Sequence, residues 1–405
     1  MMNGMSQTIY DAATLGDTDA VRRFLAADVK LATLKGGPKG WDPLTYLCFS
    51  EHLRKDKSRA FCFLDAASAL LDAGASANAG FYVNDEFESV LYAAAGIAHD
   101  AELTRLLLER GADPNDGEVT YHTPETFDNA ALRVLINSDR LSDDSLATML
   151  LRKCDWHDHG GVALLLEHGA DPNRLTLWGY TALHQAIRRD NDLETIALLL
   201  NHGADPSVPA HGRSAAAMAA WEGRGDVLNL FQRRGLAIEL QGVDRLLAAC
   251  ATNNSEVVAS LAREPELVRE IVTHEGALLG EFAGIGNTDG VRYLLSLGAD
   301  VRAMVVVSDG YWGIAKNSTA LHVAAWRARH ATVKLLIERG APVDLQDGNG
   351  RTPLMLAVRA CVDSYWKEWR SPESVATLVG AGASTDGLEL PTGYAAIDAL
   401  LVDAK

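Results

Sequence analysis

The sequence is poor in cysteine and contains no cysteine arrangement typical of a metal site or a disulfide framework. Its 405 residues include five cysteines. They are scattered, without the CxxC spacing of a zinc site or the density of a disulfide-rich domain, at Cys48, Cys62, Cys154, Cys250 and Cys361. We therefore expect reduced thiols in a cytoplasmic protein, with no metal and no other cofactor.

The chain also lacks an excess of positive charge and long apolar stretches. Lys and Arg total 37 against 54 Asp and Glu, which gives a formal net charge of -17. Binding to nucleic acid or anionic lipid depends on Lys and Arg that neutralise phosphate or headgroup charge, so both ligands are disfavoured. No stretch has the apolar length needed to span a bilayer, and residues 1–11 lack the basic and apolar segments of a secretory signal. We expect no binding to nucleic acid or membrane.

One phrase of about nine residues recurs along the chain. The six copies are LLDAGASAN from Leu70, LLERGADPN from Leu107, LLEHGADPN from Leu165, LLNHGADPS from Leu199, LLSLGADVR from Leu294 and LIERGAPVD from Leu336. In each copy, leucines close an amphipathic helix, and a glycine takes the left-handed conformation that ends it. Asp, Pro or Asn then turns the chain outward. Such self-similarity predicts a stack of repeats.

A second motif lies upstream of two copies. Thr181-Ala182-Leu183-His184 and Thr319-Ala320-Leu321-His322 are each followed by a short apolar helix. The resulting unit, a turn plus two antiparallel helices of roughly 33 residues, resembles the ankyrin repeat. The resemblance covers nearly the whole chain and implies an all-α ankyrin-repeat solenoid of about eleven helix-turn-helix repeats with terminal caps. In that family the motif's histidine hydrogen-bonds the neighbouring turn, so His184 and His322 are expected to be structural.

We expect two continuous sections, an N-terminal ankyrin-repeat array over residues 1–240 and C-terminal repeats with a cap over residues 241–405. Charged insertions interrupt the pattern at residues 51–59 and 363–371, and residues 388–405 are predicted to form a terminal helix. In the eighth repeat, Glu264-Pro265 replaces the usual glycine turn, so regularity is lost there.

The packing framework leaves loop tips and the ends of inner helices free, and in such a stack these line a concave groove. Tryptophan and arginine, the residues most enriched at binding hot spots, recur at these positions. The predicted partner-binding residues are Trp156, Trp178, Arg188, Arg189, Trp221, Glu222, Trp326 and Arg327. The alternative interpretation is that each ring packs against the loop of the next repeat and stiffens the stack.

A competing hypothesis starts from Asp155-Trp156-His157-Asp158-His159, which occupies an expected helix-to-helix turn with His157 where glycine is usual. The preceding repeat has a weak inner helix near residues 121–125. Its side chains could complete a metal or proton-transfer site. That site would consist of His122, Glu125, Asp155, His157 and His159. The structural alternative is that Asp158 caps the next helix and the imidazoles point apart.

No nucleophile elbow, phosphate loop, dinucleotide fingerprint or HExxH motif occurs in its required context. We therefore expect a monomeric scaffold or regulator that binds a protein or peptide in the concave groove, without chemistry of its own. The alternative is an enzyme or metal-binding protein with a site in the groove of repeats four to seven.

Overall fold

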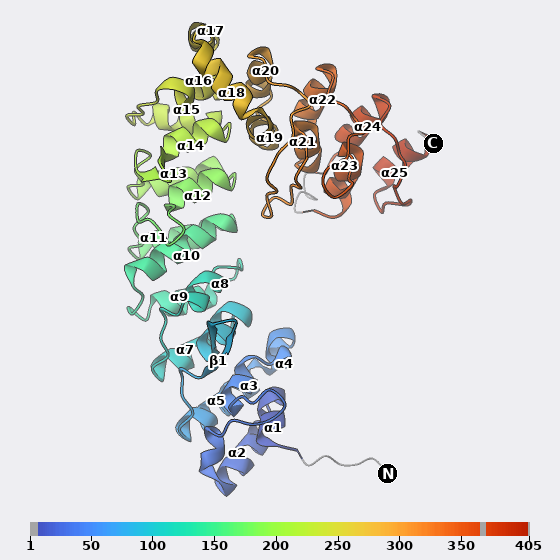
Figure 1. Ribbon diagram of the computed structural model, residues 1–405. Helices are drawn as coiled ribbons and strands as arrows, with labels where there is room; N and C mark the ends of the chain where they lie inside the picture. Colours follow the sequence, from blue (N-terminus) through green and yellow to red (C-terminus); the bar gives the residue numbers. More distant parts are fainter. Residues whose placement is uncertain (1–6, 365–369, 404–405) are drawn as a thin grey trace. The chain divides into compact units, whose positions relative to one another are not determined.

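Helices make up most of the regular structure (Figure 1). The computed structural model describes residues 7–364 and 370–403. The chain forms two compact units, Met1–Asp205 and Pro206–Lys405. Among the described residues, no helix is long and apolar enough to cross a membrane. Residues 365–369 of the second predicted insertion and the end of the predicted terminal helix lie outside the described part.

The N-terminal unit is built from short helices and one β-hairpin. Its elements are α1 (Ile9–Leu15), α2 (Thr18–Ala27), the 3-10 helix η1 (Val29–Ala32), α3 (Pro43–Cys48), α4 (Glu51–Lys55), the 3-10 helix η2 (Lys57–Arg59), α5 (Ala60–Asp72), β1 (Gly80–Val83), β2 (Glu86–Ser89), α6 (Val90–Tyr92), the π-helical turn η3 (Ala93–Ile97), α7 (Ala101–Glu109), α8 (Gly117–His122), α9 (Ala130–Ile136), α10 (Asp143–Asp155), α11 (His159–Glu167), α12 (Ala182–Arg188) and α13 (Leu193–Asn201). The predicted first insertion forms α4 and η2.

The C-terminal unit repeats the same construction. Its elements are β3 (Pro209–Ala210), β4 (Arg213–Ser214), α14 (Ala215–Trp221), α15 (Gly225–Arg233), α16 (Gly242–Ala251), α17 (Ser255–Leu261), α18 (Pro265–Thr273), α19 (Glu275–Ile285), α20 (Thr288–Ser296), α21 (Ala320–Trp326), α22 (His330–Glu338), α23 (Pro353–Val362), α24 (Glu373–Gly380) and α25 (Ala395–Asp403). Helix α25 packs on α24 and buries Ile397 and Leu401, as a terminal cap would.

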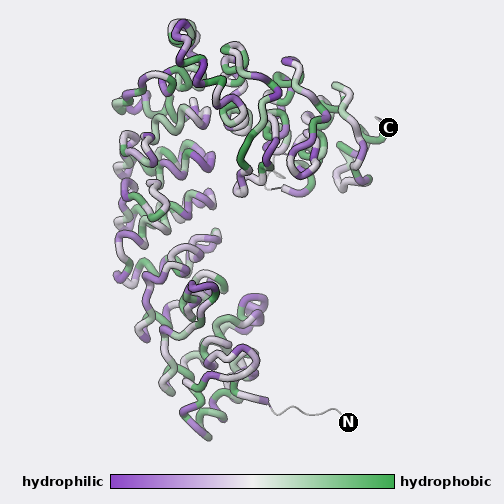
Figure 2. Tube along the Cα trace, in the orientation of Figure 1, coloured by the Kyte–Doolittle hydropathy of each residue, from purple (hydrophilic) through white to green (hydrophobic). Residues whose placement is uncertain are grey.

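Helices occur in pairs, and the pairs stack. In the N-terminal unit α10 contacts α11 and α12 contacts α13, while the first, inner helices α8, α10 and α12 pack in sequence. In the C-terminal unit the inner helices α19, α21 and α23 stack in the same way. Figure 2 shows hydrophobic and hydrophilic residues alternating along the helices, as one-sided packing requires. Side chains on successive inner helices are thereby placed next to one another.

The recurring phrase behaves as its residues predict. Its first leucine is fully buried in every copy, at Leu70, Leu107, Leu165, Leu199, Leu294 and Leu336. Burial of such a side chain stabilises the fold by about 2 kcal/mol. Its glycine has φ between 81° and 105° at Gly74, Gly111, Gly169, Gly203, Gly298 and Gly340. A residue with positive φ ends each outer helix, and glycine adopts this conformation at little steric cost because it has no Cβ.

One local prediction needs correction, and one expected irregularity takes a specific form. The inner helix expected near residues 121–125 lies earlier, at α8, because the Asp116 side chain caps its start by accepting from the Glu118 N–H. Glu125 therefore follows the helix in a bend. At Glu264-Pro265 the chain adds a helix, α18, which Pro265 can begin because the first helical N–H needs no partner. Helix α18 contacts both α16 and α19.

His322 is a buried structural histidine. Its Nδ1 accepts from the Thr319 N–H at 3.1 Å, and its Nε2–H donates to the carbonyl oxygens of Leu345 at 3.0 Å and Arg351 at 3.1 Å. Burial lowers the pKa of His322, and the neighbouring carboxylate and carbonyl groups only partly oppose this. The neutral imidazole therefore ties one repeat to the next turn.

We expect the C-terminal unit to lose stability as the pH falls below about 6.5, the usual pKa of an unfolded histidine. The unfolded chain then binds a proton that folded His322 does not, so acid favours unfolding. Urea unfolding at about pH 7.5 and about pH 5.5 measures the loss. The variant His322→Gln should show a smaller difference between the two pH values, and an equal difference would contradict the assignment. A residual slope is expected, because burial also lowers the pKa of His330.

Candidate functional site

Two hollows in the N-terminal unit share a pair of aromatic side chains. The cationic hollow, about 200 Å³, is lined by Tyr121, Leu151, Arg152, Asp155, Trp178, Tyr180, Gln185, Arg188 and Arg189. The acidic hollow, about 410 Å³, is lined by Glu86, Gly117, Glu118, Thr120, Tyr121, His122, Thr148, Leu177 and Trp178. Both are therefore bounded by Tyr121 and Trp178. We call the two together the groove.

Stacked inner helices and one loop supply most of the groove side chains, and strand β2 supplies Glu86. Tyr121 comes from α8, Arg152 from α10 and Arg188 from α12, while Trp178 precedes α12 in a loop. Loop residues between repeats and inner helices are the parts of a repeat stack that packing leaves open. The groove therefore draws on three successive repeats and on the β-hairpin that precedes them.

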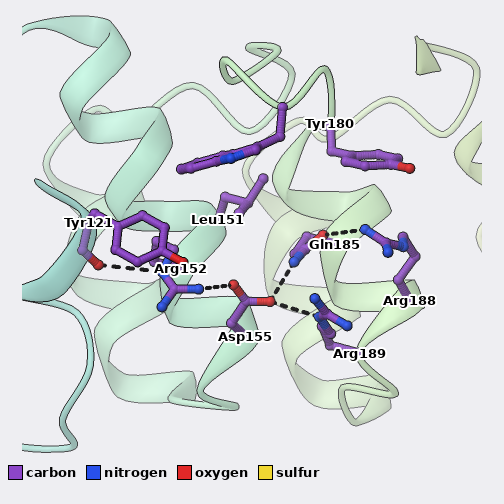
Figure 3. A pocket seen from close by; sticks show the side chains of 9 residues that line it. Tyr121, Leu151, Arg152, Asp155, Tyr180, Gln185, Arg188 and Arg189 are labelled. Carbon is purple, nitrogen blue, oxygen red and sulfur yellow. Dashed lines mark hydrogen bonds and ion pairs between the residues drawn. The ribbon is translucent and has the colours of Figure 1, made fainter. Parts of the chain in front are cut away.

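Asp155 organises the floor of the cationic hollow. Its Oδ2 accepts from Arg152 Nη1 at 2.5 Å and its Oδ1 from Arg189 Nε at 2.8 Å, so Asp155 lies between the two guanidinium groups (Figure 3). Gln185 also donates its Nε2–H to Asp155 Oδ1. Arg152 makes a second ion pair with Glu125. Arg152 and Arg189 are thus both neutralised by carboxylates.

Arg188 has a different environment. Its one hydrogen bond within the described part of the chain goes from Nη1 to Gln185 Oε1, at 3.3 Å. Its guanidinium carbon lies 4.7 Å from the centre of the Tyr180 ring. No described carboxylate forms an ion pair with Arg188. The cationic hollow therefore keeps an unneutralised positive charge at this position.

The acidic hollow collects carboxylates. Glu118 Oε2 lies 3.2 Å from His122 Nε2, and His122 Nδ1 lies 2.8 Å from Glu125 Oε2. Burial raises the pKa of Glu88, and the carboxylates of Glu118 and Glu86 raise it further. Burial, followed by the charges of Glu88 and Glu118, raises the pKa of Tyr92 to about 12. The neighbourhood of this hollow is therefore strongly negative.

The aromatic pair shared by the two hollows is held in place by further contacts. The Tyr121 and Trp178 ring centres are 5.6 Å apart and their planes meet at 55°. The Arg152 guanidinium lies 3.9 Å from the centre of the Tyr121 ring, a cation–π distance. These contacts orient Tyr121 between the charged groups of α10 and the loop that carries Trp178.

The predicted partner-binding residues fall into separate places. In the N-terminal unit, Trp178, Arg188 and Arg189 line the cationic hollow. Trp156 does not line it, but follows α10 in the next turn, where its side chain is 37% exposed. The Trp156 ring lies 6.3 Å from the ring of Phe127, which is also exposed.

In the C-terminal unit, the predicted tryptophans contact other side chains and backbone groups of the same unit. Trp221 Nε1 donates to Asp244 Oδ1 at 2.7 Å, and Arg213 lies 3.9 Å from the Trp221 ring centre. Trp326 Nε1 donates to a loop carbonyl oxygen, that of Trp312, at 2.6 Å. Arg327 lies 3.8 Å from the Trp312 ring centre. Glu222 follows Trp221 at the end of α14 and is partly exposed.

The proposed metal or proton-transfer residues are brought together only in part. His122, Glu125 and Asp155 belong to one chain of polar contacts that runs through Arg152. His159 instead contacts Thr195 Oγ1 on α13, through Nδ1 at 3.1 Å. His157 occupies the turn with φ 52°, as expected where glycine is usual. Within the described residues, no group of three or more His, Cys, Asp or Glu is placed to hold a metal ion.

Asp158 caps the helix that follows it, which is the structural alternative to the metal hypothesis. Its Oδ1 accepts from the Gly161 N–H at 2.9 Å and caps the start of α11. Its Oδ2 accepts from buried Lys153 at 2.7 Å. Asp158 is therefore engaged in holding the turn.

Sequence reasoning missed several groove residues, and those that carry charge, a polar amide or an aromatic ring include Glu86, Glu118, Tyr121, Arg152 and Gln185. Helical spacing could have indicated two of these residues. Arg152 precedes Asp155 by three residues and Gln185 precedes Arg188 by three, so each pair shares a helix face. Glu86 gave no such signal, because it lies on the β1–β2 hairpin, and no helical spacing links that hairpin to the groove.

Three comparisons with known proteins found similarities to this chain. The ankyrin-repeat domain of Bcl-3 is 23% identical and matches 56% of this chain and 96% of that chain, with a TM-score of 0.25. The E3 ubiquitin-protein ligase Ufd4 of Drosophila melanogaster is 29% identical in an alignment of length 132 that covers 28% of this chain and 4% of that protein. A family model of ankyrin repeats matches residues 150–241, 246–347 and 286–385, more than half of the sequence. The chain belongs to the ankyrin repeat family.

Proposed function

We propose that this chain is a scaffold or regulator that binds a segment of a partner protein in the groove of its N-terminal unit. Ankyrin repeats form protein-interaction domains, and the family match supports that general role. We further propose that the protein is cytoplasmic and monomeric. Cys48, Cys154, Cys250 and Cys361 are free and buried, which fits a reducing compartment.

One observation carries the proposal. Two hollows with opposite charge share the Tyr121–Trp178 pair, so an aromatic surface is flanked by charged groups on stacked repeats. A few residues, enriched in Trp, Tyr and Arg, provide most of the binding energy in protein interfaces. An elongated ligand would contact both hollows, whereas a compact ligand would fill only one.

The test uses peptides of about ten random residues displayed on phage and selected on the whole protein. The variant Trp178→Ala should bind the selected peptides about 2 kcal/mol more weakly, roughly 30-fold in Kd, because it removes a ring that lines both hollows. Fluorescence anisotropy with the synthesised peptides measures this change.

The matched control is Phe61→Ala, which removes an exposed ring on α5 of the same unit. This variant should bind as the parent does. Equal binding by parent, Trp178→Ala and Phe61→Ala would place the selected peptides elsewhere and contradict the groove proposal. Circular dichroism of each variant confirms that the helices are retained.

A further inference from the structure

The groove has two charge preferences. In the cationic hollow, Asp155 and Glu125 offset Arg152 and Arg189, which leaves the charge of Arg188 without a contacting carboxylate. Desolvated guanidinium groups favour carboxylates, which they can bind through two parallel hydrogen bonds. An acidic side chain of a ligand would complete the charge balance of this hollow.

The Arg188 guanidinium is also oriented before any ligand binds. Buried Gln185 donates Nε2–H to Asp155 and accepts from Arg188 through Oε1, so Asp155 fixes the amide that holds Arg188 (Figure 3). The Tyr180 ring lies against the same guanidinium. A preoriented donor loses less conformational entropy when it binds. Most of the N–H donors of Arg188 remain available to a ligand.

The acidic hollow has the opposite preference. Glu86 and Glu118 line it, and Glu88 and Asp116 contribute to the same field. Across the described residues, no lysine or arginine forms an ion pair with Glu86 or Glu118, and Glu118 contacts His122. Like charges held together raise the free energy of the site unless a cation joins them. A lysine or arginine side chain would relieve this repulsion.

The shared aromatic pair connects the two hollows. Tyr121 and Trp178, whose ring centres are 5.6 Å apart, border both hollows. In an extended peptide, side chains on one face recur every second residue, about 7 Å apart. An acidic and a basic side chain with one or three residues between them lie on the same face of an extended peptide, so both would face the groove while the backbone crosses the rings.

We infer that the groove recognises an extended peptide that places an Asp or Glu side chain against Arg188 and a Lys or Arg side chain against Glu118. This inference rests on the proposed function, because it specifies the ligand of the same groove. It predicts a bipolar motif rather than a uniformly acidic or apolar one.

The phage selection described above tests this ligand chemistry directly. Peptides selected on the parent protein should be enriched in an acidic and a basic residue that have one or three residues between them. The variant Arg188→Glu should weaken binding of these peptides roughly tenfold or more, and replacing the peptide's acidic residue with lysine should restore it. The variant Glu118→Lys should show the reciprocal behaviour with the peptide's basic residue.

The matched control is Arg133→Glu, which changes the net charge equally at an exposed position on the outer helix α9. It should leave binding unchanged. Peptides that are sensitive to Trp178→Ala but show no charge pair, or no rescue by charge exchange, would overturn this inference and leave the proposed function standing. Peptides insensitive to Trp178→Ala would overturn both. If the parent protein self-associates and Arg188→Glu abolishes this self-association, the groove binds a second copy of the chain. That result would also overturn the inference.

Discussion

Replacing Lys153 with methionine is expected to lower the free energy of unfolding of the N-terminal unit by about 3 to 5 kcal/mol, the usual effect of removing one partner of a buried ion pair. The Lys153 side chain is 0% exposed and that of Asp158 is 8% exposed, with 2.7 Å between Nζ and Oδ2. Lys153 also donates to the Thr126 carbonyl oxygen at 2.6 Å. The side chain thus joins the loop before α9 to the turn after α10.

The electrostatics explain why a single replacement is so unfavourable. Burial alone would raise the pKa of Asp158, but hydrogen bonds from Lys153, Gly161 and Asn129 outweigh it and hold the pKa below its ordinary value. Burial lowers the pKa of Lys153, and the ion pair with Asp158 opposes that shift. Each charge therefore depends on the other, and Lys153→Met leaves a buried carboxylate without its counter-ion.

Urea unfolding followed by circular dichroism measures the change, with Asp158→Asn and the double variant as controls. Asparagine can keep the cap of α11 while it removes the charge. The double variant should be less destabilised than the sum of the two single variants, because no uncompensated charge remains. A change below about 1 kcal/mol in Lys153→Met would show that the pair contributes little to stability.

The second large effect is expected from Gly225→Ala, which should destabilise the C-terminal unit by about 3 kcal/mol. Gly225 is the first residue of α15, and a Cβ there would lie 1.9 Å from the Ala251 carbonyl oxygen and 2.5 Å from its carbonyl carbon. These are backbone atoms of the last residue of α16, so no side-chain rotation removes the clash. The two helices would have to move apart.

Gly117→Ala is the matched control, since Gly117 is also the first residue of a helix, α8, and a Cβ there meets no atom within 4 Å. Its stability should change by less than about 1 kcal/mol. Thermal and urea unfolding of both variants give the comparison. Equal effects of the two substitutions would show that α15 can shift away from α16 without loss of packing.

Local sequence was sufficient for the repeat architecture. The recurring phrase gave the ends of outer helices, because a buried leucine and a glycine with positive φ act within a few residues of each other. The turn at His157 and the cap at Asp158 were likewise visible as local chemistry. Local reasoning misplaced the inner helix at α8, where the capping residue Asp116 outweighed the repeat register.

The side-chain contacts between different repeats could not be predicted from the sequence. Arg152 meets Glu125, Trp221 meets Asp244, and Glu86 borders the same hollow as Trp178. Each contact joins side chains from different elements, and its geometry depends on loop paths that no period in the sequence records. The tertiary structure therefore decided which charges are neutralised and which, like that of Arg188, have no ion pair with a described carboxylate.

By itself the sequence determined that this protein is a stack of helix pairs, because helix ends, buried leucines and glycine turns are set by residues close together in the chain. Only the tertiary structure decided that two hollows of opposite charge meet at Tyr121 and Trp178. The physical reason is that Coulomb interactions depend on distances in space, and stacking brings residues more than fifty positions apart into contact.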